Sequence, residues 1–129
     1  MGLLRQLSAF GMVGACATLI HVAIAWLLIE QAGLNGFIAN ACGAAGAFMV
    51  SYLGNARITF ASERGLWDSG VRYLVVTLVS LGLSSAILMF TQANGLPTSA
   101  YALIVVLTVP PTTFVLAKFW AFAPPQRQL

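Results

Sequence analysis

The sequence predicts an all-α membrane protein with four transmembrane helices, arranged as two hairpins, with both termini in the cytoplasm. Three observations support this fold class. Of the 129 residues, 60% are hydrophobic and only 7% are charged, whereas about a quarter of the residues in a soluble domain are charged. The charged residues are separated by long uncharged runs, and the lysine and arginine residues are distributed asymmetrically. This composition excludes a soluble enzyme, a nucleic-acid-binding module and a disordered chain.

Two transmembrane helices are expected in the first half of the chain. A helix needs about 20 residues to cross a hydrocarbon core of ~30 Å. The uncharged run at 6–29 predicts a first helix over residues 9–29, and the run at 31–56 predicts a second over residues 37–56. A Gly-Leu-Asn-Gly turn separates them. The segment ending at Cys16 also resembles a lipoprotein signal, but the apolar run continues beyond it, which favours an uncut first helix.

Small residues recur along both of these helices. Because small side chains let two helix backbones approach closely, they indicate packing faces between helices of this chain, with a dimer seam or a lipid-open groove as the alternatives. On the second helix the row has four-residue spacing and consists of Ala39, Gly43, Ala47, Ser51 and Asn55. On the first helix the corresponding face consists of Gly11, Gly14 and Thr18.

Two further helices are expected in the second half. The uncharged run at 73–117 is too long for one helix and contains Asn-Gly-Leu-Pro at 94–97, which is a strong turn signal. We therefore predict helices over residues 73–93 and 99–117. The Pro110-Pro111 pair predicts an interruption of the fourth helix. A faint match between the two halves favours parallel repeats, related by an axis along the membrane normal.

The basic residues predict the orientation of the helices. With four crossings, the N-terminus, the central loop and the C-terminus share one side of the membrane. That side holds every Lys and Arg of the chain, which are Arg5, Arg57, Arg64, Arg72, Lys118 and Arg127. Basic residues near helix ends remain in the cytoplasm, so both termini are expected inside the cell.

Two segments of the chain resemble motifs of the GtrA-like family. Residues 51–60 (SYLGNARITF) are similar to the family's Asn-Phe-x-x-Asn-x-Arg/Lys-Trp-x-Phe pattern, with Ser51 and Ile58 as departures. Residues 118–122 (KFWAF) are similar to its Lys-Phe-Trp-Val-Phe ending. The resemblance extends over nearly the whole chain. The other residues that match the family are Arg5, Leu7, Gly14, Thr18 and residues 38–41.

This resemblance implies a single GtrA-like transmembrane domain over residues 1–129, without enzymatic activity or a cofactor. It implies translocation of a polyprenyl-phosphate-linked sugar, such as undecaprenyl-phosphate-hexose, from the inner to the outer leaflet of the bacterial cytoplasmic membrane. The lipid would supply polysaccharide or O-antigen glycosylation, and a membrane glycosyltransferase would be a partner. The alternative is a non-transporting subunit that anchors or stabilises such a glycosyltransferase.

Candidate residues for translocation fall into two groups. Arg5, Arg57 and Lys118 end three helices on the cytoplasmic side and are candidates for phosphate binding, although they could simply set the topology and snorkel to the interface. Uncharged polar groups and one histidine could form a path for the sugar, although hydroxyls often bond to their own helix carbonyls. These pathway candidates are Thr18, His21, Asn40, Ser51, Asn55 and Ser84.

The remaining chemistry of the chain is sparse. One His and three carboxylates outside the spans predict no metal site and no catalytic acid–base pair, and no phosphate-binding loop for ATP is present. A small multidrug exporter would need a carboxylate within the membrane, which this chain lacks. Because four short helices enclose little volume, we expect a homodimer.

Overall fold

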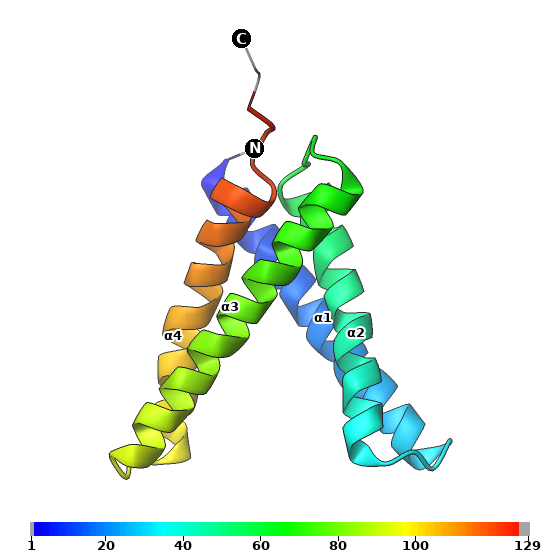
Figure 1. The fold of residues 1–129 in the computed structure, drawn as a ribbon, viewed down its shortest axis with the longest axis vertical. Helices are drawn as coiled ribbons and strands as arrows, with labels where there is room; N and C mark the ends of the chain where they lie inside the picture. Colours follow the sequence, from blue (N-terminus) through cyan, green and yellow to red (C-terminus); the bar gives the residue numbers. More distant parts are fainter. Residues whose placement is uncertain (1, 127–129) are drawn as a thin grey trace. The chain divides into compact units, whose positions relative to one another are not determined.

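The computed structural model describes residues 2–126, all of whose regular structure is helical. Arg127, one of the predicted cytoplasmic cations, lies outside the described residues. The elements in chain order are α1 (Leu3–Glu30), α2 (Gly36–Gly54), η1 (Asn55–Thr59), α3 (Leu66–Ala93), α4 (Thr98–Leu116) and η2 (Ala117–Ala121) (Figure 1).

Four helices among the described residues are long and apolar enough to cross a membrane, which confirms the predicted spans. They are longer than predicted, because α1 begins at Leu3 rather than near residue 9 and α3 begins at Leu66 rather than near residue 73. Hydropathy detects only the part of a helix that suits hydrocarbon. A helix of 28 residues is about 42 Å long, so it exceeds a core of ~30 Å and continues into the interface.

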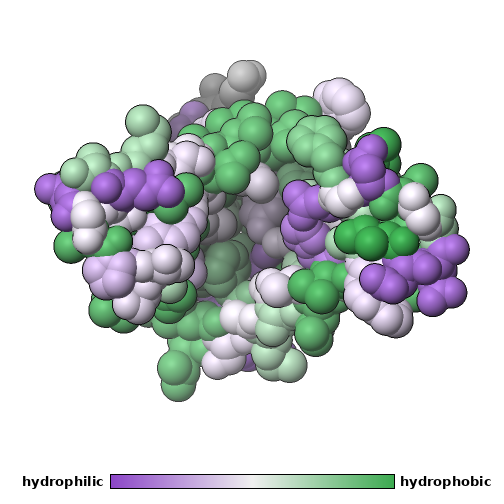
Figure 2. Space-filling model, turned by 90° about the horizontal axis from the view of Figure 1, so that it is seen from below, coloured by the Kyte–Doolittle hydropathy of each residue, from purple (hydrophilic) through white to green (hydrophobic). Residues whose placement is uncertain are grey.

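The chain forms two compact units, Met1–Ala61 (unit 1) and Ser62–Leu129 (unit 2). Unit 1 contains α1, α2 and η1, and unit 2 contains α3, α4 and η2. In each unit a short turn joins two long helices that lie side by side (Figure 1). Hydrophilic residues lie at the surface of each turn (Figure 2).

Both turns lie where the sequence predicts them. Gly33 and Gly95 have φ angles of +65° and +62°, a left-handed conformation that glycine adopts without steric cost. Asn35 then caps α2, because its side-chain oxygen accepts a hydrogen bond of 2.9 Å from the backbone N–H of Ile38.

Close packing of α1 against α2 depends on glycines of α2. A Cβ atom at Gly43 would lie 2.6 Å from the backbone oxygen of His21, and one at Gly54 would lie 2.8 Å from Cγ1 of Val13. The packing role predicted for Gly43 is therefore confirmed. Packing within the chain is not present at Gly11 and Gly14, because a Cβ at either position would meet no atom within 4 Å. A dimer seam or a lipid-open groove at this face stays a prediction. The glycines of α2 instead receive side chains of α1.

The second helix of each unit ends in a five-residue π-helix, η1 or η2. The backbone N–H of Phe60 donates to Asn55, and that of Phe122 donates to Ala117, each over 2.9 Å. Both phenylalanines have φ of −109°. The two units thus end their second helices in the same local conformation, of a kind that is frequent at functional sites.

The predicted interruption of the fourth helix is wrong, because α4 runs without a break through Pro110 and Pro111. Proline keeps a helical φ, so the helix can continue, although the ring removes its own N–H donor and crowds the carbonyl four residues earlier. In hydrocarbon, any other local conformation would leave still more backbone groups unsatisfied. Threonine hydroxyls beside the prolines also bond back to the helix, as Thr108 does to Ile104 over 2.6 Å.

Candidate functional site

Two predicted pathway residues of unit 1 form a polar pair between α1 and α2. Nε2 of His21 and Oδ1 of Asn40 are 2.8 Å apart. Because an amide oxygen only accepts hydrogen bonds, the imidazole N–H is the donor. Gly43 makes room for this pair, since a Cβ there would lie 2.6 Å from Cδ2 of His21. The pair satisfies two polar side chains within a span, where water is scarce.

A second polar group continues along α2 into η1. Nδ2 of Asn55 donates to Oγ of Ser51 over 3.3 Å, and Oγ1 of Thr59 donates to Oδ1 of Asn55 over 2.8 Å. Asn55 and Thr59 are only 1% and 0% exposed. The structure therefore gives Asn55 a packing role at the helix end, and contact of Ser51 or Asn55 with a sugar stays a prediction. Thr59 was missed by sequence reasoning, although its four-residue spacing from Asn55 was a visible signal.

Thr18 bonds to its own helix, which is the alternative to a role in the sugar path. Its Oγ1 donates to the backbone oxygen of Gly14, one turn earlier in α1, over 3.0 Å. The side chain is exposed on the helix surface. A role for Thr18 in the sugar path also remains a prediction.

In unit 2, hydroxyl pairs join α3 to α4 within the spans. Oγ of Ser84 lies 3.0 Å from the hydroxyl of Tyr101, and Oγ of Ser80 lies 2.6 Å from Oγ1 of Thr113. Ser84 was a predicted pathway residue. Tyr101 and Thr113 were missed, because only the packing of the two helices brings them opposite serines.

A Tyr101→Phe variant is expected to lower the free energy of unfolding by about 0.6 kcal/mol, the typical contribution of a hydrogen bond between membrane helices. Denaturant unfolding in detergent micelles measures this change. Ser84→Ala removes the other hydroxyl and serves as the second arm of a double-mutant cycle. If the effects of the two substitutions are strictly additive, the two hydroxyls do not stabilise each other.

The three predicted phosphate-binding residues are divided between the units. Arg5 in α1 and Arg57 in η1 belong to unit 1, and both are exposed without an ion pair or hydrogen bond from their side chains among residues 2–126. Lys118 in η2 belongs to unit 2, and its Nζ lies 5.8 Å from the ring centroid of Phe114 and 5.6 Å from that of Phe119. The two arginines of unit 1 thus retain their donors for an anion.

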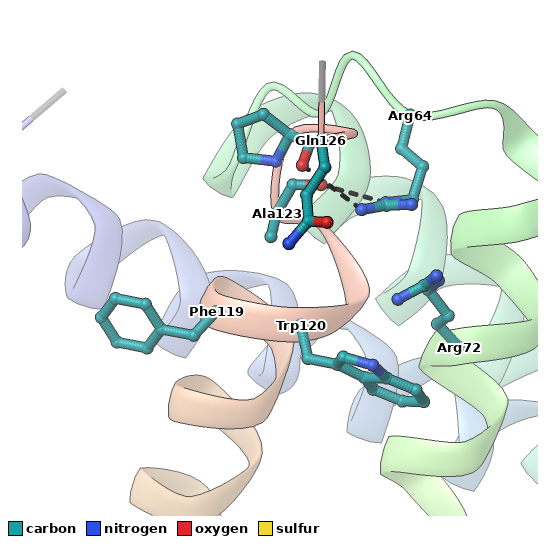
Figure 3. A pocket seen from close by; sticks show the side chains of 7 residues that line it. Arg64, Arg72, Phe119, Trp120, Ala123 and Gln126 are labelled. Atoms are coloured by element: carbon teal, nitrogen blue, oxygen red, sulfur yellow. Dashed lines mark hydrogen bonds between the residues drawn. The ribbon is translucent and has the colours of Figure 1, made fainter. Parts of the chain in front are cut away.

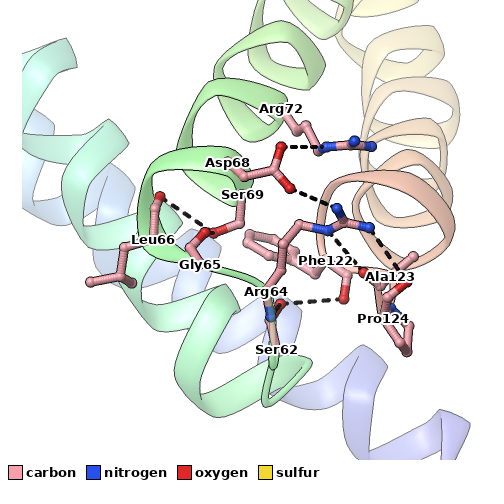
Figure 4. Close-up of polar contacts among 10 residues, drawn as sticks. All are labelled: Ser62, Arg64, Gly65, Leu66, Asp68, Ser69, Arg72, Phe122, Ala123 and Pro124. Atoms are coloured by element: carbon pink, nitrogen blue, oxygen red, sulfur yellow. Dashed lines mark hydrogen bonds and ion pairs between the residues drawn. The ribbon is translucent and has the colours of Figure 1, made fainter. Parts of the chain in front are cut away.

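A charged network in unit 2 connects the start of α3 to the segment after η2 (Figure 4). Asp68 accepts a bond of 2.6 Å from Nη1 of Arg64 and one of 3.0 Å from Nε of Arg72. Arg64 also donates from Nε to the backbone oxygen of Ala123 over 3.0 Å, and from Nη2 to that of Pro124 over 3.4 Å. From the sequence, both arginines predict only the orientation of the helices. The four-residue spacing of Arg64, Asp68 and Arg72 was a signal that their side chains could meet, although Arg64 precedes α3.

The sequence model of a protein family, the GtrA/DPMS transmembrane domain, matches residues 9–122 of this chain. This chain belongs to the GtrA/DPMS family. The match reaches all four spans, leaving out only residues 3–8 of α1, and it includes the polar pairs of both units. It confirms the resemblance in the sequence motifs. Comparisons with curated proteins and with solved structures gave no match.

Membership of the GtrA/DPMS family implies involvement in membrane processes of polyprenyl-phosphate-linked sugars. The family consists generally of non-catalytic membrane proteins. Together with the four spans, the GtrA/DPMS domain makes this chain a multi-pass membrane protein.

Proposed function

We propose that this GtrA/DPMS protein translocates a polyprenyl-phosphate-linked sugar, such as undecaprenyl-phosphate-hexose, across the bacterial cytoplasmic membrane. The sugar would then serve polysaccharide or O-antigen glycosylation on the outer side. The observation that carries this proposal is the family match over residues 9–122, which includes spans with internal polar side chains. Polar side chains inside the spans suit a protein that moves such a lipid across the membrane.

Capture of the lipid begins, in this proposal, on the cytoplasmic side, where both termini and the loop between the two units lie. Arg5 and Arg57 support this step, because their guanidinium groups are exposed and unpaired within the described part of the chain. Arginine can hold a phosphate through two parallel hydrogen bonds. Lys118 adds a cation from the corresponding helix end of unit 2.

Passage of the sugar would use the hydrogen-bonding groups inside the spans. Polar side chains in hydrocarbon are costly when unpaired. Within each of the pairs His21–Asn40 and Ser84–Tyr101, the two side chains bond to each other while no sugar is present. A sugar hydroxyl could replace one partner of such a pair, so that no group is left unsatisfied. Consumption of the lipid on the outer side would drive net transport.

The assembly we propose is a homodimer of chains whose two hairpins are parallel repeats. The matching π-helical ends of α2 and α4 support a repeat relationship. A dimer would provide a larger enclosed path than four helices alone.

The family's description favours one alternative, because it includes DPMS as well as GtrA. The second candidate function is therefore a non-transporting subunit that anchors or stabilises a polyprenyl-phosphate glycosyltransferase. This role needs the polar pairs only for helix packing.

One experiment separates the two functions in cells that lack the protein. If the protein is a translocase, lipid-linked sugar accumulates while the glycosyltransferase activity of isolated membranes remains normal. If it is an anchor, that activity and the pool of lipid-linked sugar both fall. Radiolabelled sugar nucleotide measures both quantities in the same membranes, and restored expression of the chain provides the control.

A further inference from the structure

A pocket of about 420 Å³ lies in unit 2, beside the charged network described above. Its lining comes from the loop before α3, from α3, from η2 and from the segment that follows η2. Figure 3 shows the guanidinium groups of Arg64 and Arg72 pointing into the same space, which Trp120 borders. The lining residues are Arg64, Arg72, Phe119, Trp120, Ala123, Pro124 and Gln126.

The two arginines differ in how many donors they retain. Arg64 is only 12% exposed and uses three of its nitrogens on Asp68 and on two backbone oxygens. Arg72 is 31% exposed and uses only Nε, which donates to Asp68. Among the described residues, neither Nη1 nor Nη2 of Arg72 makes a hydrogen bond. Arg64 therefore shapes the pocket, and Arg72 has the donors for a ligand.

The position of Arg72 is restrained from two directions. Asp68 holds Nε from the same helix, and the guanidinium carbon lies 5.2 Å from the ring centroid of Trp120. Stacking on an aromatic ring leaves the edge of a guanidinium group available for hydrogen bonds. A donor that is held in place before binding loses less entropy when a ligand arrives.

The charge of the network favours an anion. Arg64 and Arg72 together contribute two positive charges and Asp68 one negative charge, which leaves the network with a net charge of +1. The exposed amide of Gln126 provides a further donor in the lining. Two parallel guanidinium bonds suit the oxygens of a phosphate group, and a charge-assisted bond is about twice as strong as a neutral one.

We infer that this pocket binds a phosphate group and that Arg72 is its principal ligand. The assignment of a phosphate ligand rests on the residues of the pocket. The further statement that this phosphate belongs to a polyprenyl phosphate rests on the proposed function. Phe119 is 70% exposed and Trp120 is 41% exposed, so their rings offer apolar contact to whatever the phosphate is attached to. A lipid phosphate therefore gains contacts that inorganic phosphate lacks.

Binding to the purified full chain in nanodiscs of neutral phosphatidylcholine tests the inference. The probes are farnesyl phosphate, inorganic phosphate and farnesol, and titration calorimetry measures the affinities. We expect farnesyl phosphate to bind more tightly than inorganic phosphate, and farnesol not to bind at the pocket. Equal affinities of the two phosphates would identify free phosphate as the source. If farnesol binds as tightly as farnesyl phosphate, the inference is overturned.

Two substitutions of single charges locate the binding. Arg72→Gln is expected to weaken farnesyl phosphate binding by about tenfold or more, because it removes a charged hydrogen-bond donor. Glu63→Gln is the matched control, since Glu63 precedes Arg64 in the chain, is exposed and does not line the pocket. It should change the affinity less than about twofold, because exposed charges are screened by salt. If Arg72→Gln weakens the binding of farnesyl phosphate and Glu63→Gln strengthens it by the same factor, the affinity depends on diffuse charge. The assignment of the phosphate to this pocket would then be wrong.

A measurement on the unmodified chain avoids any effect of substitution on folding. Phenylglyoxal modifies exposed arginines, and peptide mass spectrometry reports each arginine separately. Farnesyl phosphate should protect Arg72. Protection confined to Arg5 and Arg57 would overturn the pocket while leaving anion capture in the proposed function intact. Conversely, protection of Arg72 would stand even if the chain moved no lipid between leaflets.

Discussion

A Gly43→Ala variant is expected to lose about 1 to 3 kcal/mol of unfolding free energy, which is the usual cost of overpacking a tight contact. The added Cβ would lie 2.6 Å from both the backbone oxygen and Cδ2 of His21. Backbone cannot move aside without separating α1 from α2, and that separation would also break the His21–Asn40 pair. Thermal unfolding in detergent micelles, followed by circular dichroism, measures the loss.

Two other glycines provide graded controls for this prediction. A Cβ at Gly46 would lie 2.5 Å from Cδ1 of Ile24, the far end of a flexible side chain that can rotate away, so Gly46→Ala should cost less than Gly43→Ala. A Cβ at Gly11 would meet no atom within 4 Å, so Gly11→Ala should be neutral or slightly stabilising. If all three variants unfold alike, close approach at Gly43 does not hold α1 and α2 together.

Replacing Arg57 or Lys118 with Gln is expected to abolish surface glycosylation while leaving the amount of protein in the membrane unchanged. In the proposed function these side chains capture the phosphate, and glutamine keeps a similar length without the charge. Either change leaves the other basic residues on the side proposed to be cytoplasmic and none in the two turns predicted to face outward, so the topology should be maintained. Lectin staining of intact cells measures glycosylation, and immunoblotting of membranes measures protein level.

Arg57→Lys is the matched control, because it retains the charge and loses the planar fork. Glycosylation that is reduced but present would show that charge contributes to capture independently of bidentate geometry. Glycosylation that survives both Arg57→Gln and Lys118→Gln at normal rates would refute anion capture by these two residues.

The four spans could be predicted from sequence because each depends on a property of a continuous segment. Long uncharged runs and the turns at Gly33 and Gly95 are local features, and the structure confirms them. The helix ends could not be predicted well, because α1 and α3 extend through interfacial residues whose hydropathy is ambiguous. The π-helical ends depend on backbone register, for which the composition of η1 and η2 carries no signal.

The candidate site could be predicted only as a set of residue types. His21 and Asn40 were both recognised as polar groups within spans, but their pairing required the approach of α1 to α2 at Gly43. The pocket at Arg72 was missed entirely. It forms because the chain after η2 returns to the loop before α3, where Arg64 donates a hydrogen bond to the backbone oxygen of Ala123. Contacts between segments so distant in sequence leave no periodic pattern.

Transbilayer movement of a labelled lipid in vesicles tests the translocase proposal most directly. The purified chain is reconstituted into sealed vesicles that contain a fluorescent polyprenyl-phosphate-linked hexose, and a membrane-impermeant quencher is added outside. We predict that lipid from the inner leaflet becomes quenched far faster than in protein-free vesicles, and that Arg57→Gln slows this phase. If inner-leaflet fluorescence persists equally with and without the protein, the chain is not a translocase by itself, and the anchoring function would replace the one proposed.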